Sequence, residues 1–164
     1  MLAVSVTRVV ASFLLSSLPF LTAFAQQRPE NSSESASTRQ SVAAFIDAFN
    51  RHDGHGVAMS FANDAEFTSV RGATAHGRQQ IEAFYAGVFA GRLKNAHRTA
   101  TVTSVRMLSP TLASVDATWE ITGSTTDEGA LIPLRRGILT VILAKDTNVW
   151  LILVYHELEL TPTQ

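Results

Sequence analysis

The stretch that decides the fold reads Gly137-Ile-Leu-Thr-Val-Ile-Leu-Ala144, then Lys145-Asp-Thr-Asn148, then Val149-Trp-Leu-Ile-Leu-Val-Tyr-His-Glu157. Asp and Asn favour tight turns between apolar runs, so this stretch predicts a β-hairpin. Both faces of the predicted strands are largely apolar, whereas a strand wetted on one side would alternate apolar with polar residues. We therefore expect one face to lie against helices and the other against a second layer, which a second copy of the chain could provide.

The second strand of this hairpin ends in two polar residues. Strict alternation places His156 on the face of Trp150, and Glu157 on the face of Tyr155. Both would lie at the far end of a covered sheet, where a cavity opens. A neutral imidazole there can act as a general base or hold the polar group of a ligand. The alternative is a histidine that is hydrogen-bonded at the rim of the core.

The N-terminus has the form of an export signal. Residues 1–25 contain Arg8, an apolar run from Val9 to Phe24, and the signal-peptidase pattern Ala23-Phe-Ala25. The alternative is a membrane anchor, but the run is shorter than the roughly 20 residues of a spanning helix, and Pro19 interrupts it. We expect cleavage of the signal, a periplasmic or secreted location, and no membrane attachment afterwards.

The composition excludes several functions. The 164 residues carry a formal net charge of −1, which provides no basic surface for nucleic acid. The chain has no cysteine, so disulfides, thiolate catalysis and cysteine metal sites are excluded. Residues 26–36 are polar without apolar periodicity and are predicted to be a disordered spacer. Residues 37–160 remain as a single domain that is long enough to close one core.

The spacing of apolar residues predicts three helices. The first begins with the capping-box pattern Ser37-Thr-Arg-Gln40 and shows apolar residues at i, i+3, i+4 and i+7. Asp53 is placed to cap a short second helix over residues 55–62. A third helix is predicted over residues 78–90.

The remaining segments have the pattern of strands. A small hairpin is predicted over residues 65–76. Residues 98–108 and 112–123 complete a four-stranded meander with the C-terminal hairpin, and the loop 124–133 is expected to be mobile. Helices followed by a long antiparallel sheet indicate the α+β class. A curved sheet wrapped around one long helix would form a cone with an internal cavity.

The order and spacing of these features resemble the nuclear-transport-factor-2-like superfamily over about residues 37–160. The resemblance is carried by the first helix followed by Phe61-Ala-Asn-Asp-Ala-Glu-Phe67, by Gly77-Arg78 followed by Ile81, and by the meander that ends in Trp150-Leu-Ile152 and His156. Within the superfamily, the chain is most similar to SnoaL-like proteins of the SgcJ/EcaC group. The resemblance implies a cone-shaped, cystatin-like α+β fold with three helices on a curved antiparallel sheet. It also implies a pocket between sheet and helices, and a homodimer formed through the outer sheet face.

The superfamily includes ketosteroid isomerases, dehydratases, polyketide cyclases, association domains and carriers, so the fold leaves the function open. In the isomerases, a catalytic Asp follows the Asp-Ala-x-x segment, and the matching residue here is Ser69. Their second Asp lies on a late strand, where residues 138–144 contain no carboxylate. A serine cannot act as the carboxylate base of that reaction, so steroid isomerisation is not expected.

His156 and Asp116 form the candidate catalytic pair. Asp116 and Glu120 lie on one face of their strand, opposite Trp119. If that face lines the cavity, apolar walls would favour a protonated carboxyl group that could exchange a proton with His156. If the face is wet, both carboxylates contribute to solubility, which is the commoner outcome.

The candidate ligand-binding residues are five aromatic residues and one arginine. Small-molecule pockets are largely apolar, so the expected walls are Phe67, Phe84, Tyr85, Trp119 and Trp150. The Tyr85 hydroxyl could reach a ligand or only a partner in the core. Arg135 and Arg136 begin the penultimate strand and point to opposite faces. One could therefore pair with an anionic ligand in the cavity, and the other with a carboxylate across a dimer.

The segment His52-Asp-Gly-His55 contains three side chains of the kinds that bind metals. They lie at a predicted helix end, however, and not as an i, i+4 pair on one helix, so no metal site is expected. No glycine-rich dinucleotide loop follows a predicted strand, so no cofactor is expected.

These observations favour an exported protein that binds a small, mostly apolar molecule, with cofactor-free acid–base chemistry by His156 and a carboxylate as an extension of that role. The alternative is a non-catalytic, homodimeric association module whose outer sheet face carries the function.

Overall fold

The computed structural model describes residues 23–160, and side chains from residue 32 onward. Its elements are α1 (Ala23–Asn50), α2 (Gly54–Met59), β1 (Phe61–Thr68), β2 (Thr74–His76), α3 (Gly77–Ala90), β3 (His97–Ser109), β4 (Leu112–Thr125), β5 (Leu131–Asp146) and β6 (Val149–Glu159). This is the predicted order: two helices, a small hairpin, a third helix and a four-stranded meander. Residues 1–22, which hold most of the predicted signal, lie outside the described residues. Among the helices of the described part, none has the length and apolar character needed to cross a membrane.

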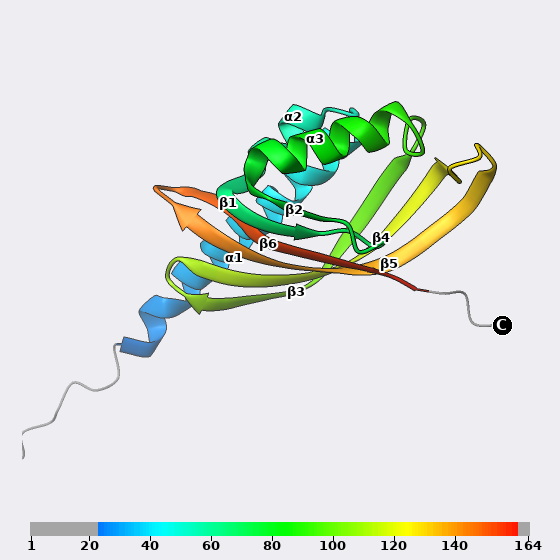
Figure 1. The fold of residues 1–164 in the computed structure, drawn as a ribbon. Coiled ribbons are helices and arrows are strands. Elements are labelled where there is room, and N and C mark those ends of the chain that lie inside the picture. Colours follow the sequence, from blue (N-terminus) through cyan, green and yellow to red (C-terminus); the bar gives the residue numbers. More distant parts are fainter. Residues whose placement is uncertain (1–22, 161–164) are drawn as a thin grey trace, which may run out of the picture.

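The six strands form one sheet in the order β2-β1-β6-β5-β4-β3. The α+β prediction is confirmed, with one correction: β1 pairs with β6 in parallel, so the sheet is mixed. Parallel pairing needs a long connection between the two strands, and here α3 and the other strands of the meander lie between β1 and β6 in the chain. Figure 1 shows the long strands curving around the side that carries α2 and α3, with α3 lying across β1 and β2. One face of the sheet is therefore covered by helices, and we call it the inner face.

Aromatic side chains fill the space between α1, α3 and the inner face. Phe45 and Phe49 of α1 are fully buried, as the predicted helical stripe requires. The Phe45 ring lies edge-on to Tyr85 of α3, with 6.1 Å between ring centroids. It also packs against Tyr155 of β6 at 5.4 Å. These contacts hold both helices to the centre of the sheet.

Helix α1 begins earlier than the sequence indicates. Residues 26–36, predicted as a disordered spacer, belong to α1. The Ser37 hydroxyl donates to the Ser33 carbonyl, so Ser37 lies inside the helix and the predicted capping box is wrong. A tertiary contact fixes this extension: the Glu34 carboxylate accepts hydrogen bonds from Lys145 Nζ at 2.6 Å and Trp150 Nε1 at 2.7 Å. A local pattern cannot reveal partners more than a hundred residues away.

Two other local predictions have different outcomes. Asp53 caps α2 as predicted, since its carboxylate accepts from the Gly56 N–H at 2.8 Å. Half of the loop predicted over residues 124–133 is strand, because β4 continues to Thr125 and β5 begins at Leu131. The Thr126 N–H donates to the Ala130 carbonyl and closes a short turn between them.

A β-bulge in β6 changes which side chains face inward. Ile152 pairs with Leu143 of β5, but the next pair joins Val154 to Ile142, so Leu153 is an extra residue. One extra residue reverses the alternation of side chains for the rest of the strand.

The reversal moves the polar end of β6. Trp150 and Ile152 are buried before the bulge, and Tyr155 is buried after it, although strict alternation would place Tyr155 on the opposite face. Glu157 follows Tyr155 to the inner face, and His156 is exposed on the outer face. The predicted position of His156 beside Trp150 is therefore wrong, because alternation counted from the sequence does not detect an inserted residue.

Candidate functional site

A small cavity lies between α3 and the inner face, and we call it the inner cavity. Its volume is about 30 Å³, close to the space of one water molecule. Its aromatic lining comes from Phe49, Phe67, Phe84, Tyr85 and Trp119, and its charged lining from Arg92, Arg98, Arg135 and Glu157. The structure thus brings together five of the six residues predicted to bind a ligand: Phe67, Phe84, Tyr85, Trp119 and Arg135.

Trp150 is the predicted wall residue that lies elsewhere. Its indole N–H donates to Glu34, and the Lys145 ammonium group lies 5.9 Å from its ring centroid. Trp150 therefore holds the first half of α1 against the β5–β6 hairpin and does not line the inner cavity.

The Trp119 indole is packed into the wall of the inner cavity by a close approach to β5. Its N–H donates to the Ile138 carbonyl at 3.1 Å. Gly137 makes room for the ring, since a Cβ atom at that position would lie 2.2 Å from Trp119 Cζ2.

A buried ion pair forms the floor of the inner cavity. The guanidinium of Arg98 contacts the Glu157 carboxylate, and their side chains are 1% and 8% exposed. The Tyr155 hydroxyl donates to Glu157 Oε1 at 2.6 Å. The Arg98 guanidinium also lies 5.3 Å from the centroid of the Trp119 ring, which is attractive for a desolvated cation. On the backbone, Asn50 of α1 binds both the Arg98 N–H and its carbonyl at 2.8 Å.

The protonation states on this floor follow from burial and from the ion pair. Burial raises the pKa of Tyr85 and of Tyr155, so both hydroxyls stay protonated. Burial alone would lower the pKa of Arg98, but the negative charge of Glu157 outweighs it and the pKa is raised. The floor therefore consists of protonated hydroxyls that are bound within it and of a neutralised ion pair.

Further arginines surround the mouth of the inner cavity. Arg135 makes a bidentate pair with Glu159, with its Nε 2.8 Å from Oε1 and its Nη2 2.6 Å from Oε2. This hydrogen bonding lowers the pKa of the Glu159 carboxyl. Arg71 and Asp127 form an exposed pair at 3.0 Å that joins the β1–β2 turn to the β4–β5 turn.

The predicted catalytic pair lies on the other side of the sheet. Asp116, Thr140 and His156 occupy one row across β4, β5 and β6 on the outer face. The Thr140 hydroxyl donates to Asp116 Oδ1 at 2.8 Å and stands between the two candidates. The structure therefore brings neither Asp116 nor His156 into the inner cavity, and the wet-face alternative holds for Asp116.

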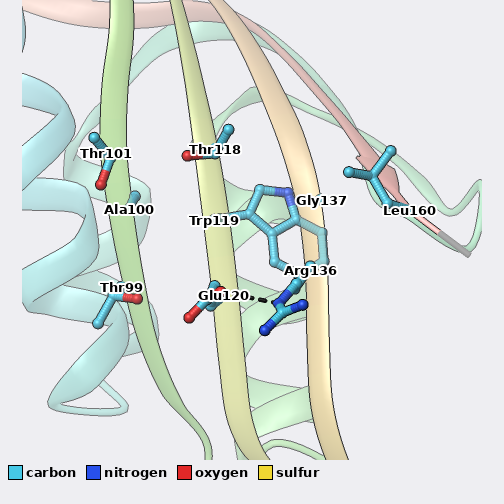
Figure 2. Close-up of a pocket in the computed structure, with 9 residues that line it drawn as sticks. All are labelled: Thr99, Ala100, Thr101, Thr118, Trp119, Glu120, Arg136, Gly137 and Leu160. Atoms are coloured by element: carbon cyan, nitrogen blue, oxygen red, sulfur yellow. Dashed lines mark hydrogen bonds and ion pairs between the residues drawn. The ribbon is translucent and has the colours of Figure 1, made fainter. Parts of the chain in front are cut away.

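A larger hollow, about 280 Å³, lies over the outer sides of β3, β4 and β5, and we call it the outer hollow. Figure 2 shows Glu120 and Arg136 reaching toward each other across neighbouring strands, with Thr99 level with Glu120 and with Thr101 and Thr118 farther along their strands. The Glu120–Arg136 pair is 3.0 Å long, and both side chains are more than half exposed. The outer hollow is lined by three threonines, by the Glu120–Arg136 pair, and by Ala100, Trp119, Gly137 and Leu160, so it has less aromatic surface than the inner cavity.

The segment His52-Asp-Gly-His55 does not converge on one point. The His52 ring packs against Phe89 with 5.2 Å between centroids, Asp53 caps α2, and His55 contacts Glu82 at 3.1 Å. Within the part of the chain that the structure describes, no group of three or more His, Asp or Glu side chains is placed to hold a metal ion.

Sequence reasoning missed Arg92 and Arg98, and it placed Glu157 at the cavity end of its strand without making it a candidate site residue. A signal existed for Arg98 and Glu157, since each is a charged residue at one end of a predicted strand. Such residues are seldom buried unless they are paired, so the two could have been matched. Their meeting also requires the Leu153 bulge, which leaves no comparable mark in the sequence.

Comparisons with known proteins match this geometry. The family model for the SnoaL-like domain matches residues 42–146. The fold is similar to an uncharacterised protein with a cystatin-like fold from Caulobacter vibrioides, at a TM-score of 0.71 and 21% identity, covering 77% of this chain and 89% of that one. No curated protein matches the sequence.

Two further solved structures have the same architecture. A ketosteroid isomerase-like protein from Erwinia carotovora atroseptica SCRI1043 aligns at a TM-score of 0.69 and 20% identity, covering 79% of this chain and 98% of that one. An NTF-2-like protein of unknown function from Shewanella oneidensis MR-1 aligns at 0.62 and 19%, covering 74% and 96%. At these identities the likeness establishes the fold, and the predicted cystatin-like cone is confirmed.

Proposed function

The chain belongs to the SnoaL-like domain family, and on that premise we propose that its inner cavity binds a small aromatic molecule. The observation that carries this proposal is the convergence of aromatic side chains from β1, α3 and β4 on one cavity. The rings of Phe67 and Phe84 lie 4.9 Å apart, and Tyr85 lies 5.3 Å from Phe84. Aromatic walls with a few polar groups are the usual lining of small-molecule sites.

A ligand larger than water requires the inner cavity to widen. Next to the lining residue Val70 in the chain, Arg71 pairs with Asp127, and their side chains are 43% and 69% exposed. An exposed pair of this kind stabilises a structure by only about 0–1 kcal/mol. Phe84 is itself half-buried at the wall. We expect entry of a ligand to need separation of the two turns and rotation of Phe84, which would also break the ring contacts of Phe84 with Phe67 and Tyr85 at about 0.5–1.5 kcal/mol each.

The test uses indole as a neutral aromatic probe and follows its binding by calorimetry. Val70 lines the inner cavity near its mouth, so Val70→Trp is expected to abolish binding by filling the entrance. Thr118→Phe fills the outer hollow instead and serves as the matched control, which is expected to bind indole as the parent protein does. Loss of binding in Thr118→Phe with retention in Val70→Trp would refute the proposal.

The inner cavity supports binding without any part for His156. We therefore expect His156→Ala to leave indole affinity unchanged, since the imidazole is exposed on the outer face. A loss of indole affinity in His156→Ala would indicate binding on the outer face and would contradict the proposal.

A second candidate function is self-association through the outer face. Ile138 and Leu158 are neighbours across β5 and β6, and they are 43% and 58% exposed. Paired apolar side chains on an open sheet face are suited to contact with a second copy of the chain. Ile138→Lys is expected to convert a dimer to a monomer in sedimentation, whereas the distant Leu131→Lys is not. A dimer that survives Ile138→Lys would remove this candidate.

We further propose that the protein is exported and that the signal is removed after Ala25, because the Ala23-Phe-Ala25 pattern follows an apolar run. Intact mass measurement of the protein from the exported fraction is expected to give a chain that begins at Gln26. A mass that retains residue 1 would contradict this.

A further inference from the structure

Arg92 differs from the other arginines at the inner cavity because it lacks a carboxylate. Arg98 and Arg135, which also line the cavity, pair with Glu157 and Glu159, and Arg71 in the nearby β1–β2 turn pairs with Asp127. Arg92 forms no ion pair within residues 32–160, although it lines the cavity. The charges of the three pairs cancel, so the mouth carries one uncompensated positive charge.

The backbone holds Arg92 in place. Its carbonyl accepts from the Thr125 N–H at 2.9 Å, which fixes the α3–β3 connection to the end of β4. The next residue, Leu93, is buried and donates its N–H to the Val88 carbonyl at 2.8 Å. The guanidinium is therefore presented from a fixed point of the backbone.

The local environment of Arg92 disfavours a lone cation. Its Nε is buried and has no hydrogen-bond partner in the described part of the chain. Burial, followed by repulsion from Arg71 and Arg135, lowers the pKa of the guanidinium, and the negative charge of Asp127 only partly opposes this. A buried polar donor without a partner is costly, and an anion placed beside it would relieve both the missing hydrogen bond and the repulsion.

We propose that the ligand of the inner cavity is an aromatic carboxylic acid whose carboxylate is bound by Arg92. This inference rests on the proposed function and names its ligand class. The guanidinium fork matches a planar carboxylate with two parallel hydrogen bonds. After rotation of Phe84 away from Phe67, the ring of the acid would take the space beside Phe67 and Trp119. A monoanion balances the one free positive charge, whereas a dianionic phosphate would leave a negative charge uncompensated at a desolvated site.

The experiment compares benzoate with benzamide, which has the same shape and no charge, by calorimetry at neutral pH and low salt. Benzoate is expected to bind at least about tenfold more tightly, as one charge-assisted contact provides. Arg92→Leu is expected to remove that preference. Arg136→Leu is the matched control, since it removes the same charge from the exposed Glu120 pair on the outer face.

The outcomes separate this inference from the proposed function. Equal affinity for benzoate and benzamide would overturn the carboxylate assignment, as would an equal loss of preference in Arg92→Leu and Arg136→Leu. In either case, indole binding that Val70→Trp abolishes would leave the inner cavity standing as an aromatic site. Tighter binding of phenyl phosphate than of benzoate would also overturn the inference, because the site would then favour a dianion.

Discussion

The inner cavity and the outer hollow lie on opposite sides of the same strands, and each contains one arginine–glutamate pair. The outer hollow is larger, about 280 Å³ against about 30 Å³, but its Glu120–Arg136 pair is open to water. The inner pair, Arg98–Glu157, is desolvated and enclosed by aromatic rings. Charges interact far more strongly where water is excluded. The smaller space is therefore better suited to bind a ligand specifically. A choice between the two sites by volume alone would favour the outer hollow.

The Leu153 bulge creates this difference between the two sides. Without the extra residue, His156 would face inward and Glu157 outward. Arg98 would then be buried without an acidic partner, which is among the costliest arrangements in a core. The bulge is thus a requirement of the buried pair and sets the chemistry of the inner cavity.

The largest expected effect comes from breaking the inner pair. Glu157→Leu leaves the Arg98 guanidinium buried without a counter-charge and is expected to lower the free energy of unfolding by about 3–5 kcal/mol. The matched variant on the outer face, Glu120→Leu, is expected to cost at most about 1 kcal/mol. Urea unfolding of the two variants measures the difference. Equal losses would show that the two faces do not differ as described.

Adjacent residues of β6 test the bulge next. Tyr155→Phe removes the hydrogen bond to the Glu157 carboxylate and is expected to cost about 1.5–3 kcal/mol. His156→Ala removes an exposed side chain and is expected to change stability by less than about 0.5 kcal/mol. The same urea titration measures both variants. A larger loss of unfolding free energy in His156→Ala than in Tyr155→Phe would indicate that the histidine faces inward and would contradict the bulge.

Two glycines provide a smaller contrast between packed and open positions. Gly137→Ala places a Cβ atom 2.1 Å from the Leu158 carbonyl oxygen and 2.2 Å from the Trp119 ring, so overpacking is expected to cost about 1–3 kcal/mol. Gly87→Ala in α3 meets nothing within 4 Å and is expected to stabilise the protein by about 0.4–1 kcal/mol. Thermal denaturation should move in opposite directions for the two variants. A shared direction would contradict the packing of Trp119 over β5.

The smallest expected effect concerns pH at the mouth of the inner cavity. Arg135 lowers the pKa of Glu159 below its ordinary value of 4.5. A depressed pKa in the folded state adds stability above the unfolded value, and this stability is lost as the pH falls through the folded pKa. Because Glu159 is partly exposed, the contribution is expected to be below about 1 kcal/mol. Glu159→Gln should flatten the dependence of the unfolding free energy on pH below pH 4.5. An unchanged dependence would show that the Arg135 contact does not stabilise the fold.

The sequence predicted the fold well because periodicity records burial. The stripe of α1, the cap at Asp53 and the meander all follow from local spacing, and each is present. The aromatic residues of the inner cavity were also predictable, because large apolar side chains on covered strands converge in a cone. Local spacing could not reveal the Glu34 contacts with Lys145 and Trp150, since these depend on how distant segments meet.

The charged part of the site was not predictable for a related reason. Face assignment by alternation fails after one inserted residue, so the Leu153 bulge exchanged the positions of His156 and Glu157. Arg92 carries no periodic signal, because it lies in the connection between α3 and β3. The charge of Arg92 is uncompensated only because the surrounding arginines are paired with carboxylates, and these pairs form only in the folded chain.

The most direct test of the central claim is ¹⁹F NMR of protein labelled with 5-fluorotryptophan and titrated with indole. The chain has two tryptophans: Trp119 lines both the inner cavity and the outer hollow, and Trp150 lies by Glu34 in the first half of α1. If indole binds in the inner cavity, the Trp119 resonance shifts and that of Trp150 stays constant. The same result is expected in Thr118→Phe, in which the outer hollow is filled. Indole binding that leaves Trp119 unshifted, or a shift that Thr118→Phe abolishes, would contradict the inner cavity as the ligand site.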